Sequence, residues 1–272
     1  MTINHTLTAH GITLRYGDRT VAQHLNLDLL PGRLTSIVGP NGCGKSTTLH
    51  ALCRLLQPAA GTVQLDGVPL GTYRGKALAR ILGLLPQSPT APEGITVTEL
   101  VGRGRHPHQG MLGRWSTHDY EAVAHALDIT GTTDLAQRCV DELSGGQRQR
   151  VWIAMALAQE TDILLLDEPT TYLDIANQLE VLDLLTDLNH RLGTTIVMVL
   201  HDLGLAARYS DHLIAMNAGR VHATGTPAEV VTPDTMSEVF GVTAQVIPDP
   251  VSGAPLVLPI GRHHTTQEKV SP

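Results

Sequence analysis

The sequence that decides the fold is Gly39-Pro40-Asn41-Gly42-Cys43-Gly44-Lys45-Ser46. It matches the phosphate-binding pattern G-x-x-x-x-G-K-[ST]. The apolar run 34–38 before it predicts a buried strand. Apolar residues after it recur at helical spacing, namely Leu49, Leu52, Cys53 and Leu56. A glycine-rich loop between a strand and a helix N-terminus points its backbone N–H groups and the positive end of the helix toward one place.

This loop therefore predicts a nucleotide triphosphate site lined by residues 39–46 together with Thr47. Lys45 supplies a cation for the β- and γ-phosphates. Ser46 supplies a hydroxyl for Mg²⁺, which prefers oxygen ligands. The ligands expected from this loop are a nucleoside triphosphate and Mg²⁺, and the resemblance described below implies that the nucleotide is ATP.

Composition limits the classes of function that need to be considered. The chain has 272 residues, 42% hydrophobic and 17% charged, which is ordinary for a globular protein. Its net charge of −7 disfavours nucleic acid as a partner. No apolar run approaches the ~18–20 residues that span a bilayer, so a membrane would be met through a partner. The three cysteines form no metal or disulfide pattern, which favours a reducing compartment.

Four predicted buried strands each end in polar groups. The first leads into the Gly39 loop, and the others end at Gln87, at Asp167-Glu168 and at His201. In open parallel sheets, ligands bind beyond the carboxyl ends of the strands, so we expect one shared site. Phosphoryl transfer needs a metal carboxylate, a group that orients water and donors for the γ-phosphate charge.

These polar groups suit those tasks. Asp167 follows an apolar strand and suits the metal, and Glu168 suits the general base. Gln87 has an amide oxygen that can bind metal or water. His201 can donate a hydrogen bond to the γ-phosphate.

The rest of the chain alternates between strand and helix patterns. Residues 12–14 and 25–29 predict antiparallel strands, and residues 88–118 predict loops and short helices that expose polar groups. A helix is expected from 147 to 159, with Ser144 as its N-cap. A terminal hairpin is expected over 242–260.

The motif Leu143-Ser144-Gly145-Gly146-Gln147 indicates which known family these features resemble. A phosphate loop, then L-S-G-G-Q, then an apolar strand with D-E-P, then a strand ending in His resembles the ATP-binding subunit of ABC transporters. Tyr16, Gln87, Leu173-Asp174 and His201 also stand in the order of that family. The resemblance covers about residues 7–242.

The resemblance implies an α/β fold, a P-loop NTPase (RecA-like) core with an N-terminal antiparallel β part and an inserted helical subdomain. The ABC ATPase domain would span 1–262, with the core at about 1–87 and 160–241. The helical subdomain would cover about 88–159, the terminal hairpin about 242–262 and a flexible tail 263–272.

The resemblance also assigns roles to individual residues. Tyr16 would stack on adenine, Gln87 would sense the γ-phosphate, and Asp174 would belong to the nucleotide site. Two copies would pair head to tail. Ser144, Gly145, Gly146 and Gln147 of one copy would then meet the γ-phosphate held by Lys45 of the other, since a hydroxyl and free N–H groups at a helix start bind anions.

A finer resemblance rests on Gly102–Gln109 and on Thr170–Ile175. These stretches are similar to ATPases that power import of iron(III)–siderophore complexes. The similarity implies a separate integral-membrane permease, an indirect substrate-binding protein, and a peripheral position on the cytoplasmic face of the cell membrane. Importers of vitamin B12 or haem are the near alternative.

Two other classes stay open at this point. One is a soluble ABC ATPase without a permease, and the other is a P-loop kinase, against which Leu143–Gln147 argues. A separate hypothesis concerns Cys43. Beside Lys45 at a helix N-terminus its thiol pKa should fall, so that alkylation would inhibit the ATPase and ATP would protect it.

Overall fold

The computed structural model describes residues 5–110 and 114–263, and its frame is a mixed central sheet. The strand order in this sheet is β10-β9-β3-β8-β7-β6. Its strands are β3 (Leu34–Val38), β6 (Leu82–Leu85), β7 (Ile163–Asp167), β8 (Thr195–Val199), β9 (His212–Asn217) and β10 (Arg220–Gly225). Strands β3, β8, β7 and β6 run parallel as successive neighbours. The four polar strand ends predicted from the sequence therefore meet at one edge.

A second, antiparallel sheet has the order β2-β1-β4-β5. Its strands are β1 (Leu7–Tyr16), β2 (Arg19–Leu29), β4 (Ala60–Leu65) and β5 (Val68–Pro69). The alternation of apolar residues along 12–14 and 25–29 produced the predicted pairing, with Ile12 opposite Leu25. Asp66 and Gly67, both with positive φ, form the tight turn between β4 and β5.

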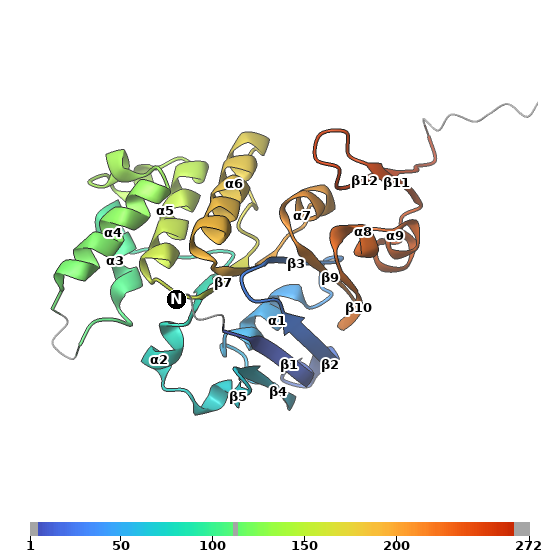
Figure 1. The fold of residues 1–272 in the computed structure, drawn as a ribbon, viewed down its shortest axis with the longest axis horizontal. Helices are drawn as coiled ribbons and strands as arrows, with labels where there is room; N and C mark the ends of the chain where they lie inside the picture. Colours follow the sequence, from blue (N-terminus) through green and yellow to red (C-terminus); the bar gives the residue numbers. More distant parts are fainter. Residues whose placement is uncertain (1–4, 111–113, 264–272) are drawn as a thin grey trace, which may run out of the picture.

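The helices and 3₁₀ turns connect these strands. They are α1 (Lys45–Leu52), η1 (Leu70–Thr72), α2 (Gly75–Ala79), α3 (Val97–Gly102), η2 (Arg103–Arg105), α4 (Thr117–Ile129), η3 (Thr133–Leu135), η4 (Val140–Glu142), α5 (Gly145–Ala158), α6 (Ile175–Leu192), α7 (Leu203–Tyr209), α8 (Pro227–Val230) and α9 (Pro233–Phe240). In Figure 1, α1 lies between the central sheet and the antiparallel sheet, and α6 and α7 lie on the other face of the central sheet.

Two apolar cores hold these layers together. The first contains Leu49 and Leu52 of α1, together with inward-facing residues of β1, β2 and one face of the central sheet. The second lies on the other face of the central sheet and joins it to α3–α7. Strands β3, β7 and β8 are buried at every position, as expected for parallel strands covered on both faces.

Helices α3, α4 and α5 pack on one another and form the block at the left of Figure 1. Ser144 caps α5 as predicted, in a reciprocal capping box with Gln147. The expectation that residues 88–118 expose their polar groups is wrong for Arg105, which is 1% exposed. Its guanidinium bonds Asp119 of α4 and the Ala158 carbonyl at the end of α5. Charge-assisted hydrogen bonds to these two buried oxygens offset part of the cost of removing the guanidinium from water.

A few boundaries differ from the sequence expectations. Helix α1 ends at Leu52 and Cys53 is its C-cap, so Cys53 and Leu56 lie beyond the helix. The terminal hairpin is present as β11 (Ala244–Pro248) and β12 (Pro255–Pro259). The expected flexible tail, apart from residue 263, lies outside the described residues. Within the described ranges, no helix is long and apolar enough to cross a membrane.

Candidate nucleotide site

A cavity of about 320 Å³ lies at the carboxyl edge of the parallel strands. Its lining comes from the β1–β2 hairpin, the phosphate loop and the ends of β7 and β8. The lining residues are Tyr16, Arg19, Val21, Asn41, Gly42, Gly44, Lys45, Ser46, Thr47, Glu168 and His201. Residues predicted from four separate stretches of sequence thus surround one space.

The phosphate loop connects β3 to α1 as the sequence predicts. Gly44 is the N-cap of α1 with φ of 105°, a left-handed conformation that L side chains rarely adopt. Lys45 is buried, and its Nζ donates to the carbonyls of Gly39 and Pro40 at 2.8 and 3.1 Å. The ammonium is therefore held inside the loop that would surround a phosphate.

Asp167 and Ser46 meet below the cavity. Ser46 Oγ donates to Asp167 Oδ1 at 2.8 Å, and Asp167 is 3% exposed. Burial raises the pKa of the Asp167 carboxyl, while the Ser46 hydroxyl and nearby His50 oppose that rise. A buried carboxylate paired with a hydroxyl is a donor set of hard oxygens, which suits Mg²⁺.

Glu168 is the most connected side chain at the site. Its Oε2 accepts hydrogen bonds from Gln87 Nε2 at 2.5 Å and from Thr171 Oγ1 at 3.0 Å. Its Oε1 lies 2.5 Å from His201 Nε2. Its φ of 54° is unusual for a residue other than glycine, and such strain is found most often at functional sites.

The L-S-G-G-Q motif does not join this cavity. Among the residues that the structure describes, those lining the cavity do not include Ser144, Gly145, Gly146, Gln147 or Asp174. Gly146 instead lies against Asn177 of α6, because a Cβ built on Gly146 would be 2.1 Å from Asn177 Oδ1. Asp174 caps α6 and also binds the Asn177 amide. The motif and the start of α6 therefore form one surface within the chain.

Two residues at the site were missed by sequence reasoning. Arg19 lines the cavity and pairs with Tyr16 across the β1–β2 turn. His50 lies one helical turn after Ser46, and its Nε2 is 3.7 Å from Asp167 Oδ2. The signals were present, since Arg19 stands in the same turn as Tyr16 and position i+4 on a helix shares a face with position i.

The expectation that the pKa of the Cys43 thiol falls is wrong. Cys43 is 4% exposed, and burial raises the pKa of its thiol despite the opposing effect of Lys45. Desolvation of the thiolate therefore outweighs the cation and the helix start. Cys43, Cys53 and Cys139 are all free in the described part of the chain.

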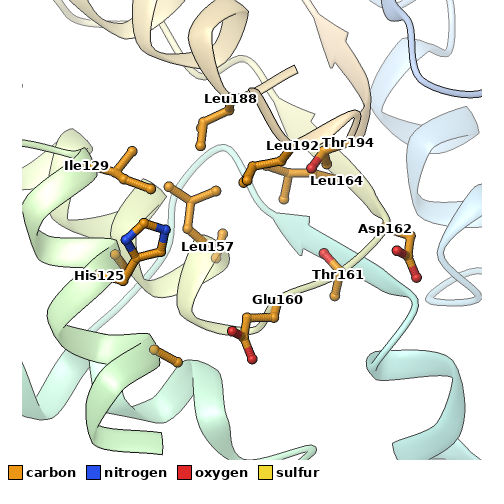
Figure 2. Close-up of a pocket in the computed structure, with 13 residues that line it drawn as sticks. His125, Ile129, Leu157, Glu160, Thr161, Asp162, Leu164, Leu188, Leu192 and Thr194 are labelled. Carbon is orange, nitrogen blue, oxygen red and sulfur yellow. The ribbon is translucent and has the colours of Figure 1, made fainter. Parts of the chain in front are cut away.

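A second cavity, of about 270 Å³, lies at the opposite edge of the central sheet. Figure 2 shows His125, Ile129 and Leu157 facing Leu188 and Leu192 of α6 across it. Thr161 and Asp162 precede β7 and Thr194 precedes β8, so the cavity lies at the amino ends of the strands. It is more apolar than the first cavity, which the phosphate loop lines.

The fold and the first cavity define the class of protein, a P-loop nucleotide-binding protein of the α/β class. Residues 22–171 match the family model described as "ABC transporter". The ferric enterobactin transport ATP-binding protein of Escherichia coli (strain K12) is 53% identical over 256 residues, covering 94% of each chain. The iron(3+)-hydroxamate import ATP-binding protein of Bacillus subtilis (strain 168) is 48% identical over 254 residues, covering 93% of this chain and 94% of that protein.

A solved structure supports the same assignment. It is the dimeric, post-hydrolysis state of an ATP-binding cassette bound to ADP and Pi, with a TM-score of 0.70 and 29% identity. The match covers 81% of this chain and 98% of that one. The chain belongs to the ABC transporter family, and it is an ATP-binding ATPase of that family.

Proposed function

We propose that this ATPase supplies the energy for import of an iron(III)–siderophore complex through a separate membrane permease. Support comes from two relatives that are about half identical to this chain. The name of one states ferric enterobactin transport, and the name of the other states iron(3+)-hydroxamate import. The observation that carries the hydrolytic role is the position of Glu168. Its carboxylate is fixed at the rim of the cavity that holds Lys45 and Ser46.

In the proposed reaction, Glu168 acts as general base toward water. The water oxygen bonds to the γ-phosphorus while Glu168 takes a water proton. The bond from the γ-phosphorus to the β–γ bridging oxygen breaks, and ADP keeps its electron pair. Lys45 and the loop N–H groups bind the triphosphate, and His201 donates to the γ-phosphate. Tyr16 lies at the mouth of the cavity, half exposed, where it can stack on adenine.

Mg²⁺ would be held by Ser46 and Asp167, with Gln87 as a third oxygen donor. When bound, this ion neutralises charge on the β- and γ-phosphates. The hydrogen bond from Ser46 to Asp167 keeps these two oxygens together.

The working unit that we propose is a head-to-tail dimer. The Ser144–Gln147 segment is not among the described residues that line the cavity, and we infer that its N–H groups meet the triphosphate of another copy. The dimeric state of the related cassette with ADP and Pi supports a dimer as the working unit. ATP would then stabilise a weak contact between two surfaces, and hydrolysis would release it.

The remaining parts of the proposal concern assembly. We divide the chain into a core at about 1–87 and 160–241, a helical subdomain at about 88–159 and a hairpin at about 242–262. The packing of α3, α4 and α5 on one another and the pairing of β11 with β12 support this division. The helical subdomain would receive the permease on the cytoplasmic face of the membrane, and Gln87 would sense the γ-phosphate and report to the permease. A substrate-binding protein would deliver the complex to the permease.

Uptake of radiolabelled ferric siderophores in a strain deleted for this chain tests the proposal. The wild-type chain should restore uptake, and a Glu168→Gln chain expressed at the same level should not. Restored uptake of vitamin B12 or haem, without ferric siderophores, would contradict the substrate class. An absence of any transport defect alongside normal ATPase activity of the purified chain would contradict the transport role.

A further inference from the structure

Thr171 is a residue near the cavity to which no role has been given so far. It is the third residue after Glu168, and the two close a turn through Thr171 N–H and the Glu168 carbonyl at 3.2 Å. Within the same turn Thr171 Oγ1 donates to Glu168 Oε2 at 3.0 Å. The hydroxyl is therefore directed at the carboxylate that we assign as the general base.

The three partners of Glu168 come from different elements. Gln87 follows β6 and His201 follows β8, so each is positioned by another strand. Thr171 is the partner that shares the backbone turn of Glu168 itself. A displacement of Gln87 or His201 would remove their contacts but would leave the contact from Thr171 in place.

We propose that Thr171 is a positioning residue for Glu168. Its hydroxyl fixes Oε2, and thereby the direction in which Oε1 faces the cavity, whichever position Gln87 takes. This inference rests on the proposed role of Glu168 as base. Because Glu168 has an unusual positive φ, its side chain leaves the backbone in a direction that a strand residue would not have. The hydroxyl of Thr171 then determines which rotamer the carboxylate occupies.

Orientation of a base has a measurable kinetic signature. A misplacement of about 1 Å can cost on the order of 100-fold in rate without weakening substrate binding. Thr171→Val keeps the shape and β-branching of the side chain and removes only the hydroxyl. We expect kcat for ATP to fall about 10-fold or more, with KM within about twofold of wild type.

Three further variants decide the matter. Thr171→Ser keeps a hydroxyl and should retain most of kcat. Thr186→Val is the matched control, because Thr186 Oγ1 also makes one hydrogen bond, to the Leu182 carbonyl at 2.8 Å, but on α6. In a Glu168→Gln background, Thr171→Val should not lower the residual hydrolysis further, since both changes act on one group.

Unchanged kcat in a folded Thr171→Val protein would overturn the proposal, as would an equal loss in Thr171→Ser. An additive loss in the Glu168→Gln background would also overturn it, because Thr171 would then act elsewhere. Thermal melting and fluorescent-ATP binding confirm that each variant is folded. The proposed function fails separately, if Glu168→Gln itself keeps wild-type hydrolysis.

Discussion

At the scale of single residues, Glu168 carries the account. It is the carboxylate that joins the ends of β6, β7 and β8 through Gln87 and His201. Glu168→Gln keeps the size and loses the base, so kcat should fall by about 10² to 10⁴ while ATP still binds. Steady-state phosphate release and equilibrium ATP binding measure the two effects. Parallel loss of ATP binding would show that Glu168 holds the nucleotide instead.

Cys43 provides a second test at this scale. Because burial raises its thiol pKa, little thiolate is present near neutral pH, and iodoacetamide should modify it slowly. The partly exposed Cys139 should react first. Modification sites are read by mass spectrometry at pH 7.5, and activity is followed in parallel. Rapid labelling of Cys43 in the native protein, with protection by ATP, would restore the original hypothesis.

The residue patterns predicted which side chains would lie together where a motif specified both their chemistry and their position in the fold. The phosphate loop, Asp167, Glu168 and His201 were placed by strand ends, and the sheet order brought them together. Thr171 was out of reach, because its contact with Glu168 depends on a turn that no motif specifies. His50 could have been found from its position one helical turn after Ser46. Cys43 was misjudged because burial depends on the packing of distant segments.

At the scale of elements, the start of α5 depends on a close approach. Gly146 lies where any Cβ would meet Asn177, whose amide is held by Asp174 at 2.8 Å. Gly146→Ala should therefore displace the L-S-G-G-Q segment and reduce ATPase activity at least 10-fold. Asn177→Ala removes the obstructing atoms, so the double variant should recover part of that loss. A double variant no better than Gly146→Ala would show that the free N–H geometry matters instead.

The first turn of α4 gives a prediction about pH. The Ser116 backbone N–H and the Arg105 guanidinium lower the Asp119 pKa to about 2, against 3.8 for the free side chain. The folded pKa lies below the unfolded one, so this stabilisation is present above about pH 4 and is lost as pH falls toward 2. Asp119→Asn should lower the free energy of unfolding by about 2 kcal/mol at pH 7.

Urea unfolding at pH 7, 5 and 3 measures this difference. The gap between wild type and Asp119→Asn should be similar at pH 7 and 5 and smaller at pH 3. Asp128→Asn, an exposed acid on the same helix, is the matched control and should change little. A gap that stays constant down to pH 3 would contradict the assignment.

The elements themselves were largely predictable. Apolar runs predicted β3, β7 and β8, and the helix expected from 147 to 159 is present as α5. Segment 102–109 was not predictable in its packing. Its charged residues predict a solvated surface, but Arg105 is buried and binds Asp119 of α4 and the Ala158 carbonyl at the end of α5. Pairing of that kind depends on tertiary structure, which local patterns do not encode.

At the scale of the whole molecule, the two groups of residues expected to bind the triphosphate lie at different places in the chain's structure. The phosphate loop and Glu168 line one cavity, while Ser144 and Gly146 lie on a surface with the start of α6. We propose that a complete site is formed by two copies, and that each lends its Ser144–Gln147 segment to the other.

The most direct test of this claim is the mass of the Glu168→Gln protein measured by light scattering with and without Mg²⁺-ATP. The account predicts a monomer without nucleotide and a dimer with ATP. It also predicts that adding Ser144→Arg to the same protein abolishes the dimer while ATP still binds. A Glu168→Gln protein that binds ATP and stays monomeric at tens of micromolar would contradict the account.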